Sequence, residues 1–106
     1  MYTHIALFTL KESAEGQTKE ENMQQILANI QHMKETISQI KNITAGPYYE
    51  VQGIPMIAYD LAIWVELETL EDYQGYIQHP VHQEAAHFAA QVSDKIAAIT
   101  YRNVLT

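Results

Sequence analysis

The segment Thr3–Leu10 is apolar on both sides of an extended chain, and this constrains the fold more than any other feature. In a strand, Ile5 and Leu7 would lie on one face and Ala6 and Phe8 on the other. Strands that are buried on both faces have this pattern. The chain must therefore form a sheet that has apolar material packed against each of its faces.

Helical periodicity is clearest after a polar segment, Lys11–Gln17, that is expected to be a loop. Thr18 and Glu21 have the spacing of a capping box, in which a hydroxyl and a carboxylate satisfy free backbone donors at a helix start. Apolar residues then recur every three or four positions, which predicts a helix over about Lys19–Ile40 with one buried stripe. The stripe consists of Met23, Ile26, Leu27, Ile30, Met33, Ile37 and Ile40.

Further elements follow in a regular order. Pro47 interrupts the next strand and places it at a sheet edge, because proline cannot donate a ladder hydrogen bond. Gly53–Pro55 is expected to be a turn, and Thr69 gives a second helix-capping signal before a short helix that runs to Gln78. Pro80 suits the first turn of the helix after it. The other expected elements are strands over Ile43–Gln52, Tyr59–Leu67 and Ile96–Val104 and a helix over Val81–Ser93.

This order predicts an α+β fold of the ferredoxin-like βαββαβ type, as a single domain over residues 1–106. Both helical elements then cover one face of a four-stranded antiparallel sheet, with the first and third strands at its centre. The first and third strands are also the most apolar ones, and the proline-bearing strand falls at an edge. The element order and the apolar pattern therefore agree.

One face of this sheet has no cover within the chain. Leaving several large apolar side chains in water costs roughly 1.5–3 kcal/mol for each, so we expect a homodimer through the sheet face, related by a two-fold axis. A curled monomer that covers the face with its own loops is the alternative. The uncovered set is expected to be either Ile5 and Leu7 with Leu61, Ile63 and Val65, or Phe8 and Leu10 with Ala62 and Trp64.

Composition excludes several classes of function. The net charge is −7 and the six basic residues are scattered singly, which disfavours nucleic acids and anionic membranes as partners. The chain has no cysteine, so disulfides and thiolate sites are absent. No apolar run is long enough to span a membrane, and the N-terminus does not resemble a signal peptide. A cytoplasmic location is the expectation.

Potentially reactive side chains concentrate around Pro80. Tyr76, His79 and His82 recur at every third position, so they could share one side of the chain where the helix bends. Histidine exchanges a proton near neutral pH, and a tyrosine hydroxyl can donate to a carbonyl or a developing oxyanion. His4 lies on the Phe8 face of the first strand and is a further candidate.

The chain resembles the stress-responsive dimeric α/β-barrel family, called Dabb. The resemblance covers nearly the whole chain and is carried by three segments, of which the last, with its Tyr and His-Pro-x-His residues, is the most specific. They are Thr3-His-Ile-Ala-Leu-Phe8, Tyr59-Asp60-Leu61 and Tyr73-Gln-Gly-Tyr-Ile-Gln-His-Pro-Val-His82. The resemblance implies a ferredoxin-like fold in which two sheets meet in a dimeric barrel.

The family includes plant polyketide cyclases such as olivetolic acid cyclase, which close a linear polyketide by aldol condensation without a cofactor. By that similarity His82 is the expected general base, Tyr76 holds the substrate carbonyl, and His4 lines the pocket. The sequence departs from the cyclases after His82, where Gln83 and Glu84 are more polar. The candidate catalytic residues are therefore His82 and Tyr76, the candidate ligand-binding residues are His4, Phe8, Tyr73 and His79, and no cofactor is expected.

Structural roles compete with these assignments. His79 is more simply a residue that caps backbone groups at the helix junction, and His82 and Tyr76 could be buried groups with satisfied hydrogen bonds. Asp60 could accept backbone donors at a strand entry. His32 and His87 are expected at the surface. No third ligand is evident beside His79 and His82, so no metal site is expected.

Three functions remain open at this point. The first is a non-catalytic dimer that binds a small apolar or carbonyl ligand between the sheet and the helices. The second is a cofactor-independent cyclase-like lyase that uses a His/Tyr pair. The third is a monooxygenase, with or without haem, because other dimeric-barrel families perform such chemistry.

Overall fold

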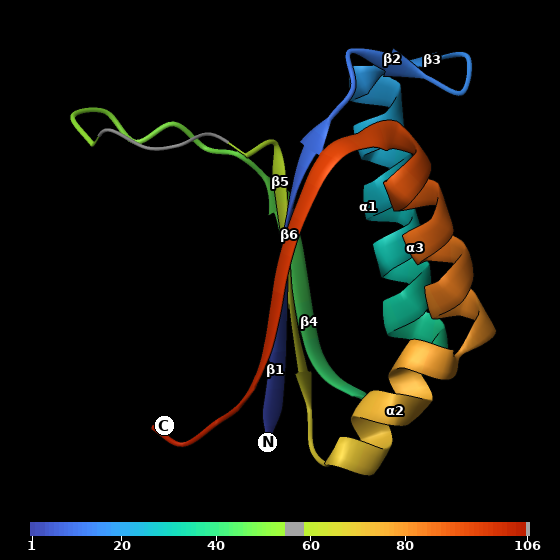
Figure 1. Ribbon diagram of the computed structural model, residues 1–106, viewed down its shortest axis with the longest axis vertical. Coiled ribbons are helices and arrows are strands. Elements are labelled where there is room, and N and C mark those ends of the chain that lie inside the picture. The colour runs from blue at the N-terminus through green and yellow to red at the C-terminus, as the bar shows by residue number, and fades with distance from the viewer. Residues whose placement is uncertain (55–58, 106) are drawn as a thin grey trace.

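The computed structural model describes residues 1–54 and 59–105, and its architecture is the expected ferredoxin-like α+β fold. One layer is a sheet, and the other layer consists of helices that all lie on the same side of it (Figure 1). The helices are α1 (Lys19–Thr36), α2 (Leu70–Gln78) and α3 (Pro80–Val92), and the strands of the large sheet are β1 (Tyr2–Leu10), β4 (Ile40–Pro47), β5 (Leu61–Leu67) and β6 (Ser93–Arg102). Within residues 1–54 and 59–105, no helix is long and apolar enough to span a membrane.

The strands of the large sheet follow the order β4-β5-β1-β6, and every pair in it is antiparallel. The two most apolar strands, β1 and β5, are central, as their sequences predict. Strand β4, which ends at Pro47, forms one edge of the sheet. Proline has no N–H to donate, and at an edge this costs the sheet no ladder hydrogen bond. The other edge is β6, the last strand of the chain.

The face of the sheet toward the helices, here called the inner face, carries the core. In the strand register Phe8 lies opposite Leu61, and Ala6 lies opposite Ile63. Leu61 is 1% exposed, and Val65 and Leu67 are fully buried. The residues that the alternation of β5 assigns to one face are therefore the buried ones.

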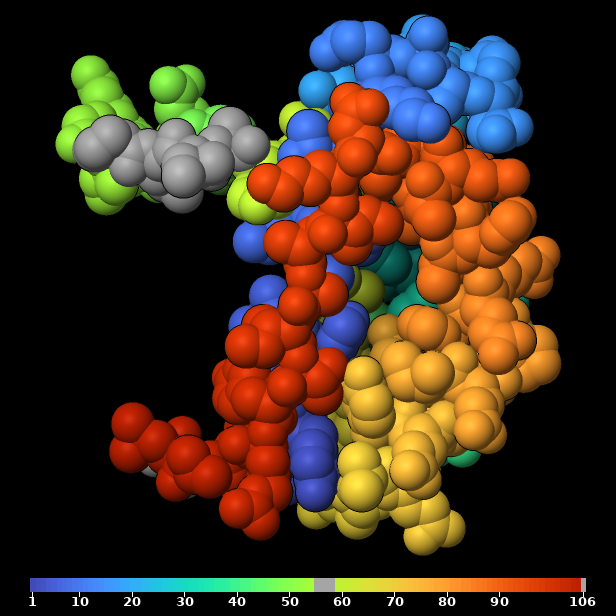
Figure 2. Space-filling model, in the orientation of Figure 1, coloured from blue at the N-terminus to red at the C-terminus, as the bar shows by residue number. Residues whose placement is uncertain are grey.

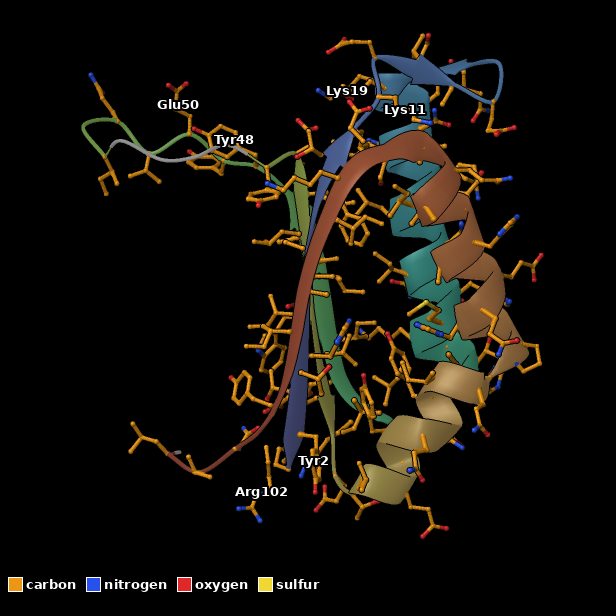
Figure 3. The ribbon with its side chains drawn as sticks, viewed as in Figure 1. Tyr2, Lys11, Lys19, Tyr48, Glu50 and Arg102 are labelled. Carbon is orange, nitrogen blue, oxygen red and sulfur yellow. The ribbon has the colours of Figure 1, made fainter. Side chains whose placement is uncertain are left out.

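The opposite face, here called the outer face, is also apolar, and none of the three helices covers it (Figure 1). Ile5 lies between Trp64 on β5 and Ile99 on β6, and Leu7 lies between Ala62 and Ala97. Ile99 is 60% exposed. Side chains therefore extend from the sheet in both directions (Figure 3).

This register corrects the expected grouping of apolar residues. Ile5 and Leu7 were expected to share a face with Leu61, Ile63 and Val65, but they share it with Ala62 and Trp64. The reason is that antiparallel pairing sets Ile5 opposite Trp64 and Phe8 opposite Leu61, and residues that lie opposite one another point to the same side of a sheet.

Several element boundaries also differ from the expectation. Helix α1 ends at Thr36, because Ile37 adopts extended backbone angles and Ile40 already belongs to β4. Ile37 is nevertheless buried in the core, so the apolar stripe continues past the helix. The expected loop Lys11–Gln17 contains a small hairpin of β2 (Ser13–Ala14) and β3 (Gln17–Thr18). Its turn uses positive φ angles at Glu15 (52°) and Gly16 (73°), which suit a tight hairpin.

Two segments leave the sheet on the side opposite the helices. One is the arm, residues 48–54, which follows β4 in place of the longer strand expected there; the other is the C-terminal tail after β6 (Figure 1). Tyr48 and Glu50 lie on the arm, and Arg102 lies near the opposite end of the sheet (Figure 3). The arm and tail thus flank the two ends of the outer face. Pro55 of the expected turn lies outside the described residues.

Candidate ligand-binding cavity

A cavity of about 170 Å³ lies between the inner face and helices α1 and α3. It opens between α3 and β6, where the surface is hollowed and the teal atoms of α1 are visible inside (Figure 2). Ala86, Ile96 and Ala98 line it while remaining exposed, so they form its mouth. The other lining residues are His4, Ala6, Phe8, Ile26, Asn29, Ile30, Met33, Ile63, Tyr76, His82, Ala85 and Ala89.

The wall of the cavity is apolar except for four side chains, which are His4, Asn29, Tyr76 and His82. None of the described lining residues is an Asp, Glu, Lys or Arg. Binding sites for small molecules commonly combine an apolar wall with a few polar groups that fix the ligand's orientation. The cavity is suited to a small uncharged molecule with a polar group.

Much of the cavity volume exists because short alanine side chains line it. Three lie on α3, at Ala85, Ala86 and Ala89, and another, Ala98, lies on β6. Protein interiors are otherwise close-packed, so a run of short side chains facing a sheet leaves room that larger residues would fill. The cavity is thus a property of the α3 and β6 sequences.

His82 lies in the first turns of α3, and a backbone contact fixes which of its ring nitrogens carries the proton. Its Nδ1 is 3.1 Å from the carbonyl oxygen of Ile77. A carbonyl can only accept, so Nδ1 donates and the lone pair of the neutral ring is on Nε2. Burial lowers the pKa of His82, an effect that the Ile77 carbonyl partly offsets and His79 adds to. The ring is therefore neutral near pH 7 and able to accept a proton at Nε2.

Tyr76 projects from α2 beside this histidine, and the two ring centroids are 4.4 Å apart. Only 2% of Tyr76 is exposed. Burial, with a smaller contribution from the neighbouring Tyr73, raises the pKa of the Tyr76 hydroxyl well above its ordinary value. The hydroxyl therefore stays protonated and can serve as a hydrogen-bond donor but not as a base.

His4 faces the cavity from the central strand β1. Its Nδ1 is 2.7 Å from the hydroxyl oxygen of Thr100 on β6. Burial lowers the pKa of His4, and the nearby His82 lowers it further, because two positive charges in one apolar cavity repel each other. Two neutral histidines and a protonated tyrosine thus meet at one end of the cavity.

The six candidate residues of the sequence analysis fall into two groups. His4, Phe8, Tyr76 and His82 line the cavity. Tyr73 and His79 do not. Tyr73 packs behind Tyr76, with ring centroids 6.4 Å apart, and its hydroxyl is 3.0 Å from that of Thr100.

His79 occupies the junction between α2 and α3. It is the N-cap of α3, and its Nδ1 accepts a hydrogen bond from the backbone N–H of Val81 at 3.1 Å. This is the capping role that competed with ligand binding in the sequence analysis. Because Nδ1 is occupied by the helix start, His79 directs its hydrogen bonding toward the backbone and away from the cavity.

Asp60 also has the structural role considered for it. Its Oδ2 accepts the backbone N–H of Leu10 at 2.7 Å, and its Oδ1 is 3.1 Å from Nζ of Lys19. The carboxylate thereby connects the end of β1 to the start of α1. His32 and His87 are exposed on the helices, as expected. Among the described residues, no cluster of three or more His, Cys, Asp or Glu side chains could hold a metal ion.

Sequence reasoning overlooked two polar residues, Asn29, which lines the cavity, and Thr100, which contacts His4. Asn29 lies on the buried stripe of α1 between Ile26 and Met33, so a polar residue within the stripe was the signal that could have identified it. Thr100 had no such signal, because threonine is common in strands and its contact with His4 joins residues far apart in the chain.

Comparisons with known proteins agree with this architecture. The family model described as Stress responsive A/B Barrel Domain matches residues 2–103. Among curated protein sequences, none matches the chain significantly.

Solved structures with similar folds come from bacteria and plants. A dimeric ferredoxin-like protein of unknown function from Thermobifida fusca is 22% identical, with a TM-score of 0.77 and coverage of 94% of this chain and 88% of its own. A protein from Arabidopsis thaliana is 21% identical, with a TM-score of 0.77 and coverage of 100% and 98%. The hydroxynitrile lyase from Passiflora edulis is 17% identical, with a TM-score of 0.77 and coverage of 99% and 95%.

Proposed function

The chain belongs to the stress responsive A/B barrel domain family, and from this premise we propose that it binds a small neutral carbonyl compound and moves a proton on it without a cofactor. His82 is the proposed base and Tyr76 the proposed donor to the carbonyl oxygen. The supporting observation is that the two rings lie 4.4 Å apart in an apolar cavity while Nδ1 of His82 is held by a backbone carbonyl. This leaves Nε2 of His82 as the basic nitrogen.

The class of ligand follows from the wall and the volume. No ionic side chain of the described lining would balance a charged ligand, and burying an unpaired charge is costly. A dry cavity of about 150 Å³ is known to hold benzene, so about 170 Å³ accommodates a molecule of one ring or a short branched chain. A linear polyketide needs more room than this, which makes a small-molecule lyase the better candidate than a polyketide cyclase.

The proposed step is reversible proton transfer next to a carbonyl. Nε2 of His82 removes a proton from the carbon adjacent to the carbonyl, and the Tyr76 hydroxyl donates a hydrogen bond to the oxygen of the resulting enolate. Return of the proton, or loss of a neighbouring group, completes the step. The Passiflora protein of similar fold is named a hydroxynitrile lyase, so this fold also supports catalysis. The monooxygenase alternative and the absence of a cofactor remain predictions from the sequence.

A direct test uses acetophenone, a neutral methyl ketone with one ring, in deuterated buffer. We expect saturable binding by NMR and deuterium exchange of the methyl protons faster than in buffer alone. His82→Gln should slow this exchange by about 10²–10⁴-fold, the usual contribution of a general base. His87→Gln, which changes an exposed histidine of the same helix, is the matched control and should behave like the native protein.

Two results would contradict the proposal separately. Bound acetophenone that exchanges no faster than in buffer would remove the catalytic part and leave a ligand-binding protein. Failure of acetophenone to bind, or equal binding of the anion benzoate, would remove the proposed ligand class.

The same subunit is proposed to form a homodimer through the outer face. Ile5, Leu7, Trp64 and Ile99 make this face apolar across three strands, and a monomer rarely leaves so large an apolar patch in water. The Thermobifida fusca neighbour is described as dimeric. Because the cavity is on the inner face and opens beside α3, a partner on the outer face would leave its mouth uncovered. A sedimentation mass of one chain would exclude the dimer.

A further inference from the structure

Thr100 connects two side chains that come from opposite layers of the molecule. It lies on β6, and its hydroxyl oxygen is 2.7 Å from Nδ1 of His4 on β1 and 3.0 Å from the hydroxyl of Tyr73 on α2. Both distances are typical of good hydrogen bonds. The three groups form a chain that leads from a residue behind the cavity to a residue that lines it.

The acidities of the three groups set the direction of this chain. A phenol is a stronger hydrogen-bond donor than an aliphatic hydroxyl, and an unprotonated imidazole nitrogen is the strongest acceptor of the three. The Tyr73 hydroxyl therefore donates to Oγ1 of Thr100, and the Thr100 hydroxyl donates to Nδ1 of His4. Since Nδ1 accepts, the proton of neutral His4 is on Nε2.

The two histidines of the cavity then have opposite tautomers. His82 carries its proton on Nδ1, because the Ile77 carbonyl accepts from that atom. His4 carries its proton on Nε2, because Thr100 donates to the other nitrogen. One ring therefore offers a lone pair and the other an N–H group.

We propose that Thr100, supported by Tyr73, is a positioning residue that fixes His4 as a second hydrogen-bond donor to the carbonyl oxygen of the ligand. This inference rests on the proposed function. It assigns the electrophilic side of the site to His4 and Tyr76 and the basic side to His82. A donor held in place before the ligand arrives needs no reorganisation when negative charge develops on the oxygen.

The lowered pKa values of both histidines are consistent with this division, because the scheme needs both rings neutral. The groups that face His4 are the Thr100 hydroxyl and the rings of Tyr73 and His82. None of these supplies a negative charge near neutral pH that would hold an imidazolium in place.

The tautomer itself can be observed without any ligand. In protein labelled with ¹⁵N at histidine, the two-bond ¹H–¹⁵N correlation pattern identifies which ring nitrogen carries the proton. We expect His4 in the Nε2–H form at pH 7.5 and His82 in the Nδ1–H form. Thr100→Val keeps the shape of the side chain and suits a strand, and it should convert His4 to a mixture of tautomers. Thr100→Ser should restore the native pattern.

The matched control is Thr44→Val, the same change on β4, the opposite edge strand, where the side chain is also exposed. It should leave both histidines unchanged. In the acetophenone titration, Thr100→Val should weaken binding by about tenfold, the effect of one hydrogen bond to a polar group, and Thr44→Val should have no effect. Tyr73→Phe should give a smaller loss, since Thr100 remains.

The outcomes separate this inference from the proposed function. An Nδ1–H pattern for native His4, or an unchanged pattern in Thr100→Val, would overturn the positioning role whatever the protein binds. An altered tautomer with unchanged acetophenone affinity would show that His4 does not hold the carbonyl. Loss of exchange in His82→Gln does not depend on either result.

Discussion

The two faces of the sheet use the same strands but differ in what covers them. The inner face packs against α1 and α3 and contains the cavity that two histidines and a tyrosine line. The outer face is apolar too, but none of the three helices covers it, and the arm and the tail flank its ends (Figure 1). Apolar character alone therefore does not distinguish a core from an interface.

The difference lies in which neighbours the chain itself supplies. A helix that follows a strand returns over one face, so that face is satisfied within the subunit and its stability is independent of protein concentration. In the proposed homodimer the other face is covered by a second molecule, so its contribution to stability follows mass action. Four predictions test this distinction, beginning with the largest effect.

The first prediction compares two leucines on neighbouring central strands. Leu61→Ala on the inner face should lower the free energy of unfolding by about 2–5 kcal/mol, because it leaves a cavity in a packed core. Leu7→Ala changes the outer face, so its cost should shrink as the protein is diluted. Urea unfolding at several protein concentrations measures both. A concentration-independent loss for Leu7→Ala equal to that for Leu61→Ala would contradict the distinction.

The second prediction concerns a charge placed on the outer face. Ile99→Lys would put a charged group from each subunit into the proposed interface, and an uncompensated buried charge costs about 3–5 kcal/mol. The dimer dissociation constant, measured by sedimentation equilibrium, should rise at least a hundredfold while the subunit stays folded. Leu70→Lys is the matched control, since Leu70 on α2 is 51% exposed and Ile99 60%. Equal dissociation constants for the two variants would place the interface elsewhere.

The third prediction concerns the stability of helix α1, which packs only on the inner face. Thr18 caps α1, with its hydroxyl oxygen accepting the Glu21 backbone N–H at 3.2 Å. Thr18→Ala should lower the free energy of unfolding by about 1 kcal/mol and leave the dimer dissociation constant unchanged. Thermal unfolding and sedimentation measure the two quantities. A change in dimer affinity would mean that the two faces are energetically coupled.

The fourth prediction is a modest pH dependence that originates on the inner face. The pKa values of His4 and His82 are lowered in the folded state, so just below pH 6.5 the unfolded chain binds more protons than the folded one. Stability should therefore be fully present above pH 6.5 and decline as the pH falls through the lowered pKa values of the two histidines. His4→Gln should reduce this slope, and His32→Gln, at an exposed position, should not. A slope unchanged by His4→Gln would refute the assignment.

The fold was predictable because its signals are local. The alternation in β5, the capping residues Thr18 and Thr69 and the proline in β4 each act within a few residues, and the structure agrees with all of them. The grouping of the two apolar faces was not predictable in the same way. It depends on the register between Ile5 and Trp64, which are distant in sequence, and either grouping preserved the alternation.

The candidate site was predictable only in part. Tyr76, His82 and His4 have side chains with evident chemistry, and the topology brings them together. The alanines that create the cavity were not recognised, because their contribution is the volume they do not occupy. Thr100 was missed because its role comes from two contacts across the sheet and helix layers, which no spacing in the chain reveals.

Alternate residues of strand β1 point to opposite faces of the sheet and have different roles. Its even-numbered residues, including His4 and Phe8, line the cavity, and its odd-numbered residues, including Ile5 and Leu7, lie on the outer face, where the homodimer is proposed to form. Substitutions can therefore change the residues of one face without changing those of the other. A single inserted or deleted residue would exchange the two sets of residues between the faces, so that His4 would point outward and Ile5 inward. Variation in length along this strand should therefore be tolerated only in steps of two residues, whereas substitutions can change the cavity lining and the outer face independently.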